Sequence, residues 1–525
     1  MEILNKQKIF ELLSSRFDEE KTLSQIPNPS LLKDADKAAS RIAKAIKNNE
    51  KITLVGDYDV DGISATAIMC DFFAQIPYPL DAVIPNRFND GYGVSPTILN
   101  RIDADLVISV DNGITAIEAA DICKERGIDL IITDHHTPGE ILPRAYAIVD
   151  PKLKECQYPF KEICGAQVAW LLLGLLKRKL SINIDMKQFL DILTIAIIAD
   201  VMPLININRL LVKEGLKVLM NSSRPASVII KDFINKPYIS SEDIAFAIAP
   251  RINAAGRLED ASIALNFFRA KDVNIAYNYF NRLNNLNEQR KETEAYTTKQ
   301  ATASVNKNDK IIVVAGEDWH EGVVGIVASR LTDKFGRPSI VLNIEDKKAK
   351  GSARSIGEVD IYKLLAANNN LLNGFGGHKM AAGLSIDKEN IYSFTKAINE
   401  SAKNIPDSCF LPKDDVLGIL DSSSIDIELL NIFDMFEPYG EANKRPTFLI
   451  QNAYIEDIKI FGREKNHSKI IIRQNKDDLN SLELTLFREV FEMPQNKKIT
   501  CSYTVNKNIW NNRISTQLLI NKIYI

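Results

Sequence analysis

Short apolar runs that end on acidic residues are the main pattern in the first part of the chain. Residues 52–55, 105–110 and 129–133 are largely β-branched, as expected of strands that are buried on both faces of a parallel sheet. Helical segments lie between them, such as 114–126. The alternation predicts an α/β fold with a parallel sheet. In such folds, ligands bind outside the carboxyl ends of the strands.

The remainder of the chain changes pattern several times. The segment 194–200 is ambiguous between helix and strand, and we favour a helix. Residues 270–306 lack Gly and Pro and predict one long polar helix of up to ~55 Å. A second α/β unit begins near 310. After a mixed stretch that starts near 413, five short strand-like runs predict an OB-like β-barrel: 453–461, 468–473, 482–486, 499–505 and 515–524.

These patterns divide the chain into consecutive segments. We expect an N-terminal helical segment, a parallel-sheet domain, a connecting helix, a smaller α/β domain and a C-terminal barrel. Their expected bounds are 1–50, 51–265, 266–308, 309–405 and 413–525.

Composition narrows the class of protein. The chain of 525 residues is 45% hydrophobic and 25% charged, which is typical of globular domains. Its longest apolar run, 168–176, is shorter than the ~20 residues of a membrane span, and no signal peptide is visible, so we expect a cytoplasmic protein without membrane contact. The six cysteines form no CxxC pair and are expected to be reduced.

Charge is uneven along the chain. The net charge is −3, yet residues 445–525 hold 13 Lys and Arg against 8 Asp and Glu. A basic C-terminal module therefore lies in a chain that is otherwise acidic, which favours contact with nucleic acid through that module.

Acidic residues and histidines gather just past the predicted strands and helices. Like charges ~4 Å apart repel by about 1 kcal/mol in water and more in a cleft, and a divalent cation removes that repulsion. The triad at 57, 59 and 61 alone is typical of a solvated loop, and a Ca²⁺ loop is excluded because Ile68 stands at the twelfth position. The whole set predicts a metal site: Asp57, Asp59, Asp61, Asp111, His135, His136 and Asp200.

The donor types indicate which ions bind. Oxygen donors with one or two imidazoles favour Mn²⁺ or Mg²⁺, and no cysteine falls inside these motifs. So many carboxylates suit two ions that share a bridging ligand, as in phosphoryl-transfer sites. Asp111 stands alone at its strand end and is our candidate for the bridge. We expect Asp111 and His136 to carry the catalysis.

Candidate phosphate contacts lie in both α/β units. Ser352 and Arg354 occupy a Gly/Ser/Arg segment that suits a phosphate. Arg87 alone is typical of an isolated surface arginine. His378, after two glycines, is either a buried structural residue or a phosphate contact. The roles of His320 and His467 stay open, although a loop position suits His467.

Taken together, the motifs resemble those of the DHH phosphoesterase superfamily. The segments 57–62, 111–113, 134–136 and 198–201 look like its metal-binding motifs, and 376–383 resembles its DHHA1 domain. Segments 251–257 and 438–446 make the chain similar to one branch, the RecJ family of bacterial exonucleases. The resemblance runs in order over about 50–525.

This resemblance implies a function. It indicates a 5′→3′ exonuclease for single-stranded DNA, which releases 5′-mononucleotides by two-metal hydrolysis in recombination and repair. The alternatives are a DHH-type phosphodiesterase of short oligonucleotides or nucleotide phosphates, and a non-catalytic DNA-binding relative. The filled metal motifs argue against the latter. The implied partners of this monomer are single-strand-binding protein and a RecQ-type helicase.

The resemblance also assigns residues to the substrate. It places the active site in the cleft between the DHH catalytic domain and the DHHA1 domain, with a C-terminal OB fold for nucleic acid. The implied substrate contacts are Arg87, Asn112, Arg251, Asn253, Arg257, Ser352, Arg354, Gly376, Gly377 and His378.

Overall fold

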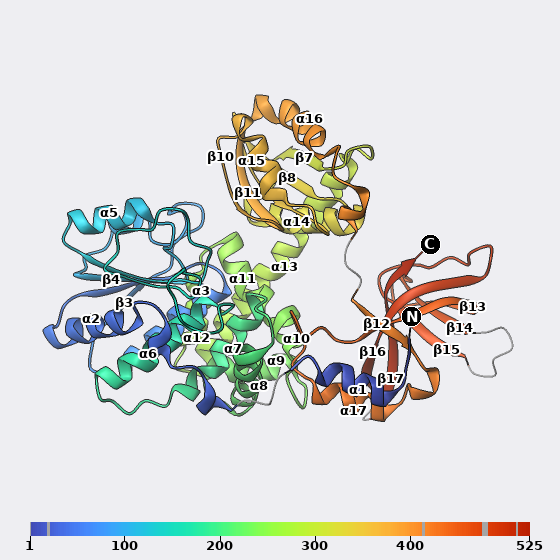
Figure 1. Ribbon diagram of the computed structural model, residues 1–525, viewed down its shortest axis with the longest axis horizontal. Coiled ribbons are helices and arrows are strands. Elements are labelled where there is room, and N and C mark those ends of the chain that lie inside the picture. Colours follow the sequence, from blue (N-terminus) through green and yellow to red (C-terminus); the bar gives the residue numbers. More distant parts are fainter. Residues whose placement is uncertain (1, 18–21, 412–414, 475–480, 511–512, 525) are drawn as a thin grey trace.

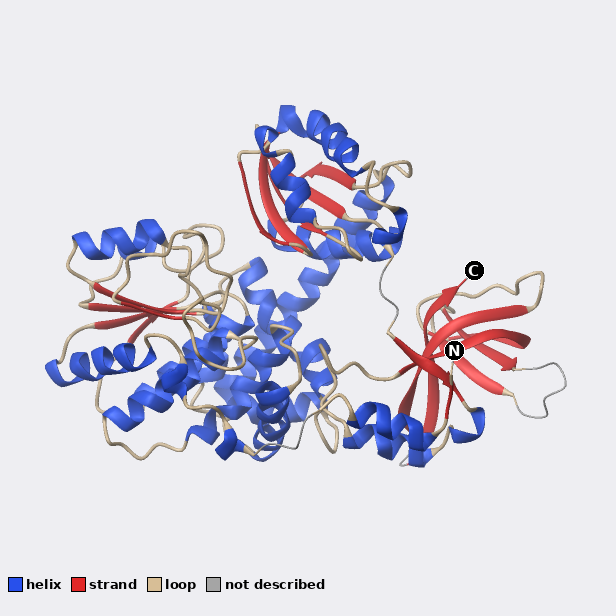
Figure 2. Cartoon of the chain, viewed as in Figure 1, coloured by secondary structure: helices blue, strands red, loops and turns tan. Residues whose placement is uncertain are grey.

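Three separate sheets organise the described part of the chain, and a long helix joins the first two of these units (Figures 1 and 2). The computed structural model describes residues 2–17, 22–411, 415–474, 481–510 and 513–524. Within these ranges, no helix combines the length and the apolar character needed to cross a membrane.

The first sheet is parallel throughout and has the order β3-β2-β4-β5-β6. Its strands are β2 (Ile52–Val55), β3 (Asp81–Val83), β4 (Leu106–Val110), β5 (Asp129–Thr133) and β6 (Ala147–Val149). Every residue of β2 and β4 is buried, which explains their unbroken apolar sequence. The predicted α/β class with a parallel sheet is confirmed. The chain order reverses between β2 and β4, where such sheets bind ligands.

Helices cover this sheet and extend it into a helical body. Those around the sheet are α2 (Ala35–Asn48), α3 (Val60–Phe73), α4 (Pro96–Leu99), α5 (Ile117–Glu125) and α6 (Gly165–Lys179). The body consists of α7 (Leu190–Ala199), α8 (Asn206–Asn221), α9 (Pro225–Ile234), α10 (Ser241–Asp243), the π-helix η4 (Ile244–Ile248), α11 (Ala249–Leu258) and α12 (Ser262–Arg269). The segment near 194–200 is thus helical, as we favoured.

One long helix, α13 (Val273–Ala303), leads from this body to the second α/β unit (Figure 1). Its 31 residues span roughly 46 Å at 1.5 Å per residue. The prediction of a single long helix is confirmed, although the helix is shorter at both ends than the segment 270–306.

The second unit has a mixed sheet in the order β10-β11-β9-β8-β7. Its strands are β7 (Ile312–Glu317), β8 (Ser339–Glu345), β9 (Lys348–Arg354), β10 (Gly374–His378) and β11 (Ala381–Asp387). Its helices are α14 (Glu321–Phe335), α15 (Ile361–Ala367) and α16 (Ile391–Ala402). Only β7 and β8 pair in parallel.

The third sheet closes on itself. Its strands are β12 (Val416–Leu420), β13 (Thr447–Phe461), β14 (His467–Arg473), β15 (Leu482–Leu486), β16 (Lys498–Trp510) and β17 (Arg513–Tyr524), with α17 (Ile427–Met435) beside them. The order β13-β14-β15-β17-β16 returns to β13 through the β13–β16 pairing. Each of the predicted runs falls within one of these strands, and the closure agrees with an OB-like barrel.

The first residues of the chain belong to this third unit. Strand β1 (Ile3–Leu4) pairs in parallel with β12, and α1 (Lys6–Ser14) buries Ile9 and Leu13 in the core of the barrel. We expected one helical segment over 1–50. The structure instead separates residues 2–17 from α2, because their apolar side chains are covered by the barrel.

Short 3₁₀ turns complete the described secondary structure. They are η1 (Leu23–Gln25), η2 (Pro29–Leu31), η3 (Met186–Phe189), η5 (Asn369–Leu371), η6 (Lys388–Asn390), η7 (Asp407–Phe410) and η8 (Ser422–Ser424).

Candidate metal centre and phosphate cluster

The predicted metal ligands meet at the carboxyl edge of the parallel sheet. Asp57 and Asp59 follow β2, Asp111 follows β4, and His135 and His136 follow β5. Asp200 comes from the end of α7. We call these side chains, together with Asp61, the metal cluster.

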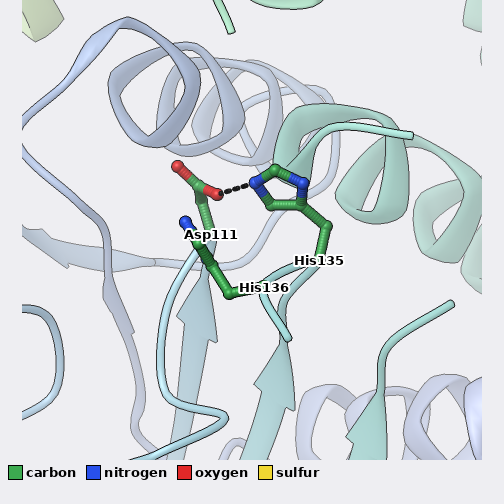
Figure 3. Close-up of side chains that lie close together, drawn as sticks. All are labelled: Asp111, His135 and His136. Atoms are coloured by element: carbon green, nitrogen blue, oxygen red, sulfur yellow. Dashed lines mark ion pairs between the residues drawn. The ribbon is translucent and has the colours of Figure 1, made fainter. Parts of the chain in front are cut away.

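Asp111 lies at the centre of the metal cluster. Its backbone adopts a left-handed conformation (φ 65°), and its carboxylate Oδ1 lies 3.2 Å from Nε2 of His135 (Figure 3). The same His135 atom is 3.5 Å from Asp200 Oδ2 and 3.7 Å from Asp61 Oδ2. A Cβ at Gly165 would lie 2.4 Å from Asp111 Oδ1, so only glycine allows α6 to approach this closely.

Two helix N-termini hold the neighbouring carboxylates. Asp59 caps α3 by accepting hydrogen bonds from the amides of Asp61 (2.9 Å) and Gly62 (3.1 Å). Asp61 accepts from the first amides of α6, those of Gly165 (2.6 Å) and Ala166 (2.9 Å). The partial positive charge of these termini stabilises the ionised carboxylates.

The ligand atoms form three overlapping groups. In each group, all ligand atoms lie within 4.8 Å of one another. The groups are Asp57, Asp59 and Asp111; Asp111, His135 and His136; and Asp61, His135 and Asp200. Asp111 and His135 each belong to two of them, and of these two only Asp111 has a carboxylate, whose two oxygens suit a bridging ligand.

Unsatisfied charge makes the metal cluster suitable for cations. Burial and then neighbouring carboxylates raise the pKa values of Asp57, Asp111 and Asp200 well above the usual range. Asp111 Oδ1 and Asp200 Oδ2 are buried without a hydrogen-bond partner. Burial lowers the pKa of His135 to about 4, which keeps its imidazole neutral. Buried oxygen acceptors and a neutral imidazole are the donor set of a divalent metal site.

Asp134 was not among the predicted site residues, but it orients the histidines. Its Oδ1 accepts from the backbone amides of His135 and His136 and lies 2.7 Å from Nδ1 of His136. Burial lowers the pKa of His136, but this contact and the nearby carboxylates outweigh burial and raise it to about 9. Carboxylates commonly fix metal-binding histidines in this way.

Tyr92 was also missed by the sequence analysis. Its hydroxyl lies 3.4 Å from the carbonyl oxygen of Asp111, and its ring packs edge-on against Tyr58 and His136. Burial raises the pKa of its hydroxyl. The flanking Gly91 and Gly93, both at positive φ, are the sequence signal that could have indicated a fixed tyrosine.

Basic and hydroxyl side chains from both α/β units form a second group, which we call the phosphate cluster: Arg87, Arg257, Ser352 and Arg354. Arg354 Nη1 donates to Ser352 Oγ (2.7 Å), and Arg257 Nη1 donates to the carbonyl of Gly322 in α14 (3.2 Å). Burial and then the positive charges of Arg87 and Arg290 lower the pKa of Arg257 to about 10. An anion placed there would relieve this repulsion.

The glycine-rich hairpin is in register with this cluster. His378 lies opposite Ala381, which lies opposite Arg354, and Gly376 is aligned with Ser352 through Gly383. Two strand spacings separate the aligned residues, or roughly 10 Å. His378 is exposed, so it is not a buried structural histidine. Gly377 has φ 141° and faces Ala381 and Ala382.

Three other predicted substrate residues lie outside the phosphate cluster. Asn112 is fully buried, and its amide bonds the backbone of Val94, Val55 and Val110, so it braces the sheet and cannot reach a substrate. Arg251 is bound by Asn284 of α13 and covers Phe233, so no described contact brings it to the phosphate cluster.

Asn253 lines a cavity of about 590 Å³ beside the metal cluster, with Arg257 and Arg290. The structure also shows the surroundings of the two histidines whose roles the sequence left open. His320 caps α14 by accepting from the amide of Gly322, and His467 begins β14 and packs against Phe461 and Phe487.

Family models match three parts of the chain. The DHH family N-terminal domain matches residues 51–197, the DHHA1 domain matches 308–404, and the RecJ OB domain matches 418–522.

Whole-chain comparisons agree with these models. The single-stranded-DNA-specific exonuclease RecJ of Bacillus subtilis is 36% identical over 507 residues, covering 94% of this chain and 64% of that protein. The enzyme of the same name from Haemophilus influenzae is 31% identical and covers 96% of this chain and 93% of that protein. The chain therefore spans less than two thirds of the Bacillus relative and nearly all of the Haemophilus one.

A solved structure shares the fold. The crystal structure of RecJ in complex with Mn²⁺ from Thermus thermophilus aligns with a TM-score of 0.81 at 29% identity. The alignment covers 94% of this chain and 72% of that chain.

Proposed function

This chain belongs to the RecJ family of single-stranded-DNA-specific exonucleases, and from that premise we propose that it degrades single-stranded DNA from the 5′ end. The observation that carries the proposal is the position of the phosphate cluster beside the metal cluster, with residues from both α/β units. A terminal phosphate held there places the next phosphodiester bond at the carboxylates. The products are then 5′-mononucleotides, released during recombination and repair.

The metal cluster would hold two divalent ions, Mn²⁺ or Mg²⁺, with Asp111 as the bridging ligand. When bound, such ions activate water and neutralise charge that builds on phosphorus. His135 supplies a neutral Nε2, and Asp134 holds Nδ1 of His136 and thereby orients its ring. The amides of α6 fix the carboxylate of Asp61 beside His135.

The phosphate cluster would bind and orient the substrate. Arg257 is tied to Gly322 of α14, and Arg354 to Ser352, so both guanidinium groups are fixed before DNA arrives. Asn253 lines the adjoining cavity, where the following nucleotides would lie. Gly376, Gly377 and His378 would approach the chain end from β10. Because fixed donors lose little entropy on binding, the terminal phosphate would determine the register of cleavage.

The change Arg354→Ala tests the direction of attack. Loss of charge-assisted hydrogen bonds worth ~1.5–3 kcal/mol should reduce the preference for a 5′-phosphate over a 5′-hydroxyl roughly 10- to 100-fold. Arg144→Ala is the control, because Arg144 is exposed and pairs with Asp121. The measurement is hydrolysis of oligonucleotides labelled at either end. Mononucleotides released first from the 3′ end, or equal rates on blunt duplex, would contradict the proposal.

The competing proposal is a phosphodiesterase that prefers short oligonucleotides. The basic barrel argues against it, since such an enzyme has no use for contacts far from the scissile bond. Faster turnover of dinucleotides than of long strands would favour this alternative.

The proposed function also implies an oligomeric state, a location and protein partners. We propose a monomer that acts in the cytoplasm, with single-strand-binding protein and a RecQ-type helicase as partners, because these supply and hold unpaired strands. Co-sedimentation of the purified proteins with and without DNA tests these contacts.

A further inference from the structure

Two cavities of opposite charge flank the phosphate cluster. The cavity of about 590 Å³ is lined by Ala199 and Val201, the neighbours of Asp200 in the chain, and its lining contains four cations against two carboxylates. Three of these cations, Arg290, Lys444 and Arg445, have ion-pair partners. The second cavity, of about 870 Å³, lies between Phe88 and the start of α14. Its lining holds five carboxylates against two lysines: Glu317, Asp318, Glu321, Glu345 and Asp346 with Lys350 and Lys388. We call it the acidic cavity.

Only part of this negative charge is compensated. Lys388 pairs with Glu317 (2.7 Å), and Lys350 pairs with Glu321 (3.1 Å). Among the residues that the structure describes, no Lys, Arg or His lies within ion-pair distance of Asp318, Glu345 or Asp346. The acidic cavity therefore carries an excess of three negative charges.

The acidic cavity shares a wall with the phosphate cluster. Phe88 follows Arg87, and its ring packs edge-on against His320 with the centroids 5.6 Å apart. Two residues further along, the carbonyl of Gly322 accepts the hydrogen bond from Arg257. No member of the metal cluster is among the described residues that line this cavity.

We propose that the acidic cavity is an electrostatic end stop, which prevents a DNA strand from continuing beyond the phosphate cluster on its 5′ side. The inference rests on the proposed exonuclease function. A continuing strand would have to place phosphates beside Asp318, Glu345 and Asp346, three exposed carboxylates without an ion-pair partner among the described residues, and like charges repel. The lining of the other cavity has no excess of negative charge, so a strand can lead away on that side only.

The end stop has two consequences for substrate choice. A strand without an end cannot occupy the phosphate cluster, so circular single-stranded DNA should stay intact. Phosphates added to the terminus should also weaken binding, because a 5′-triphosphate projects extra charge toward the acidic cavity. We expect a 5′-monophosphate to be preferred over a 5′-triphosphate by roughly tenfold, and less at high salt, which screens the repulsion.

The test removes the uncompensated charge without changing the backbone. The triple variant is Asp318→Asn, Glu345→Gln and Asp346→Asn. Asp318 (φ 60°) and Asp346 (φ 54°) are left-handed, a conformation that asparagine adopts readily. A glutamine at 345 keeps an acceptor for the amide of Asn343, now at 3.0 Å. The matched control neutralises acids of the same domain outside this cavity: Asp333→Asn, Glu389→Gln and Glu400→Gln.

The readout is kcat/KM on linear oligonucleotides with either 5′ end, together with nicking of a circular strand. The triple variant should lose most of the preference for the monophosphate, cut the circle, and keep the rate of the parent on the monophosphate. An unchanged preference with an intact circle, or an equal change in the control, overturns the end stop. Failure of the parent protein to degrade the linear monophosphate from its 5′ end would instead refute the proposed function.

Discussion

Replacing Asp111 by asparagine should stabilise the metal-free protein while abolishing hydrolysis. Asp111 combines a left-handed backbone (φ 65°) with a fully buried carboxylate, and asparagine suits both the conformation and the shape. The substitution therefore changes little except one negative charge. The expected gain in stability follows from the carboxylates around it.

The structure sets the scale of this gain, because 4.8 Å is the largest separation in the group and therefore gives the smallest repulsion. The ligand atoms of Asp57, Asp59 and Asp111 all lie within 4.8 Å of one another. Two unit charges at that distance repel by ~3.5 kcal/mol at an effective dielectric constant of ~20, so the two pairs that include Asp111 total about 7 kcal/mol. Burial and neighbouring carboxylates raise the pKa of Asp111, and protonation relieves part of this repulsion. We expect a net gain of ~1–3 kcal/mol.

Thermal unfolding in EDTA measures the stability of the metal-free protein, and unfolding in saturating Mn²⁺ measures the stabilisation by the metal. In EDTA the variant should unfold at a higher temperature than the parent. Mn²⁺ should raise the unfolding temperature of the variant less than that of the parent, because a bridging ligand is lost. The variant should also fail to hydrolyse DNA. Asp121→Asn is the control, since Asp121 faces Arg144 at the surface. A variant that is less stable in EDTA, or that gains as much from Mn²⁺, would refute the reasoning.

Two further changes test the fold, one at a buried carboxylate near the metal cluster and one at the N-terminal segment of the barrel. Burial raises the pKa of Asp150 to about 7, so ionisation of this carboxyl destabilises the folded protein increasingly as pH rises from ~4 to ~7. Asp150→Asn should therefore raise the free energy of unfolding by up to about 4 kcal/mol at pH 8 and by little at pH 4. Denaturant unfolding across this range checks it, and a difference independent of pH would contradict it. Deleting residues 1–17 removes Leu4, Ile9 and Leu13 from the barrel core, so amide exchange in β12 should accelerate while β2 stays protected. Unchanged exchange in β12 would show that the segment is dispensable.

The sequence predicted the metal cluster because two regularities coincide there. Buried parallel strands have a recognisable apolar pattern, and their carboxyl ends meet at one edge of the sheet. Residues such as Asp57, Asp111 and His135 are therefore brought together by the topology alone. Their assignment as metal ligands remains a prediction, since only their positions follow from the fold.

What the sequence could not predict depends on side-chain direction and on distant contacts. Asn112 adjoins Asp111 in the chain, yet its side chain turns into the sheet and bonds Val55. Arg251 lies in the same motif as Arg257, but Arg251 bonds Asn284 of α13 whereas Arg257 bonds Gly322 of α14. The pairing of β1 with β12 joins residues more than 400 positions apart, and no local periodicity encodes such a contact.

The order of charges along the cleft explains why cations should govern binding as well as chemistry. The phosphate cluster is positive and lies between two regions of negative charge, the metal cluster and the acidic cavity. Without cations, both regions repel a phosphodiester, so a strand has no favourable direction beyond Arg257 and Arg354. Ions bound by the metal cluster would reverse the sign of one side only, because the acidic cavity contains none of its ligands. A strand would then leave the phosphate cluster in a single direction, and the proposed polarity of digestion would follow from the arrangement of charge.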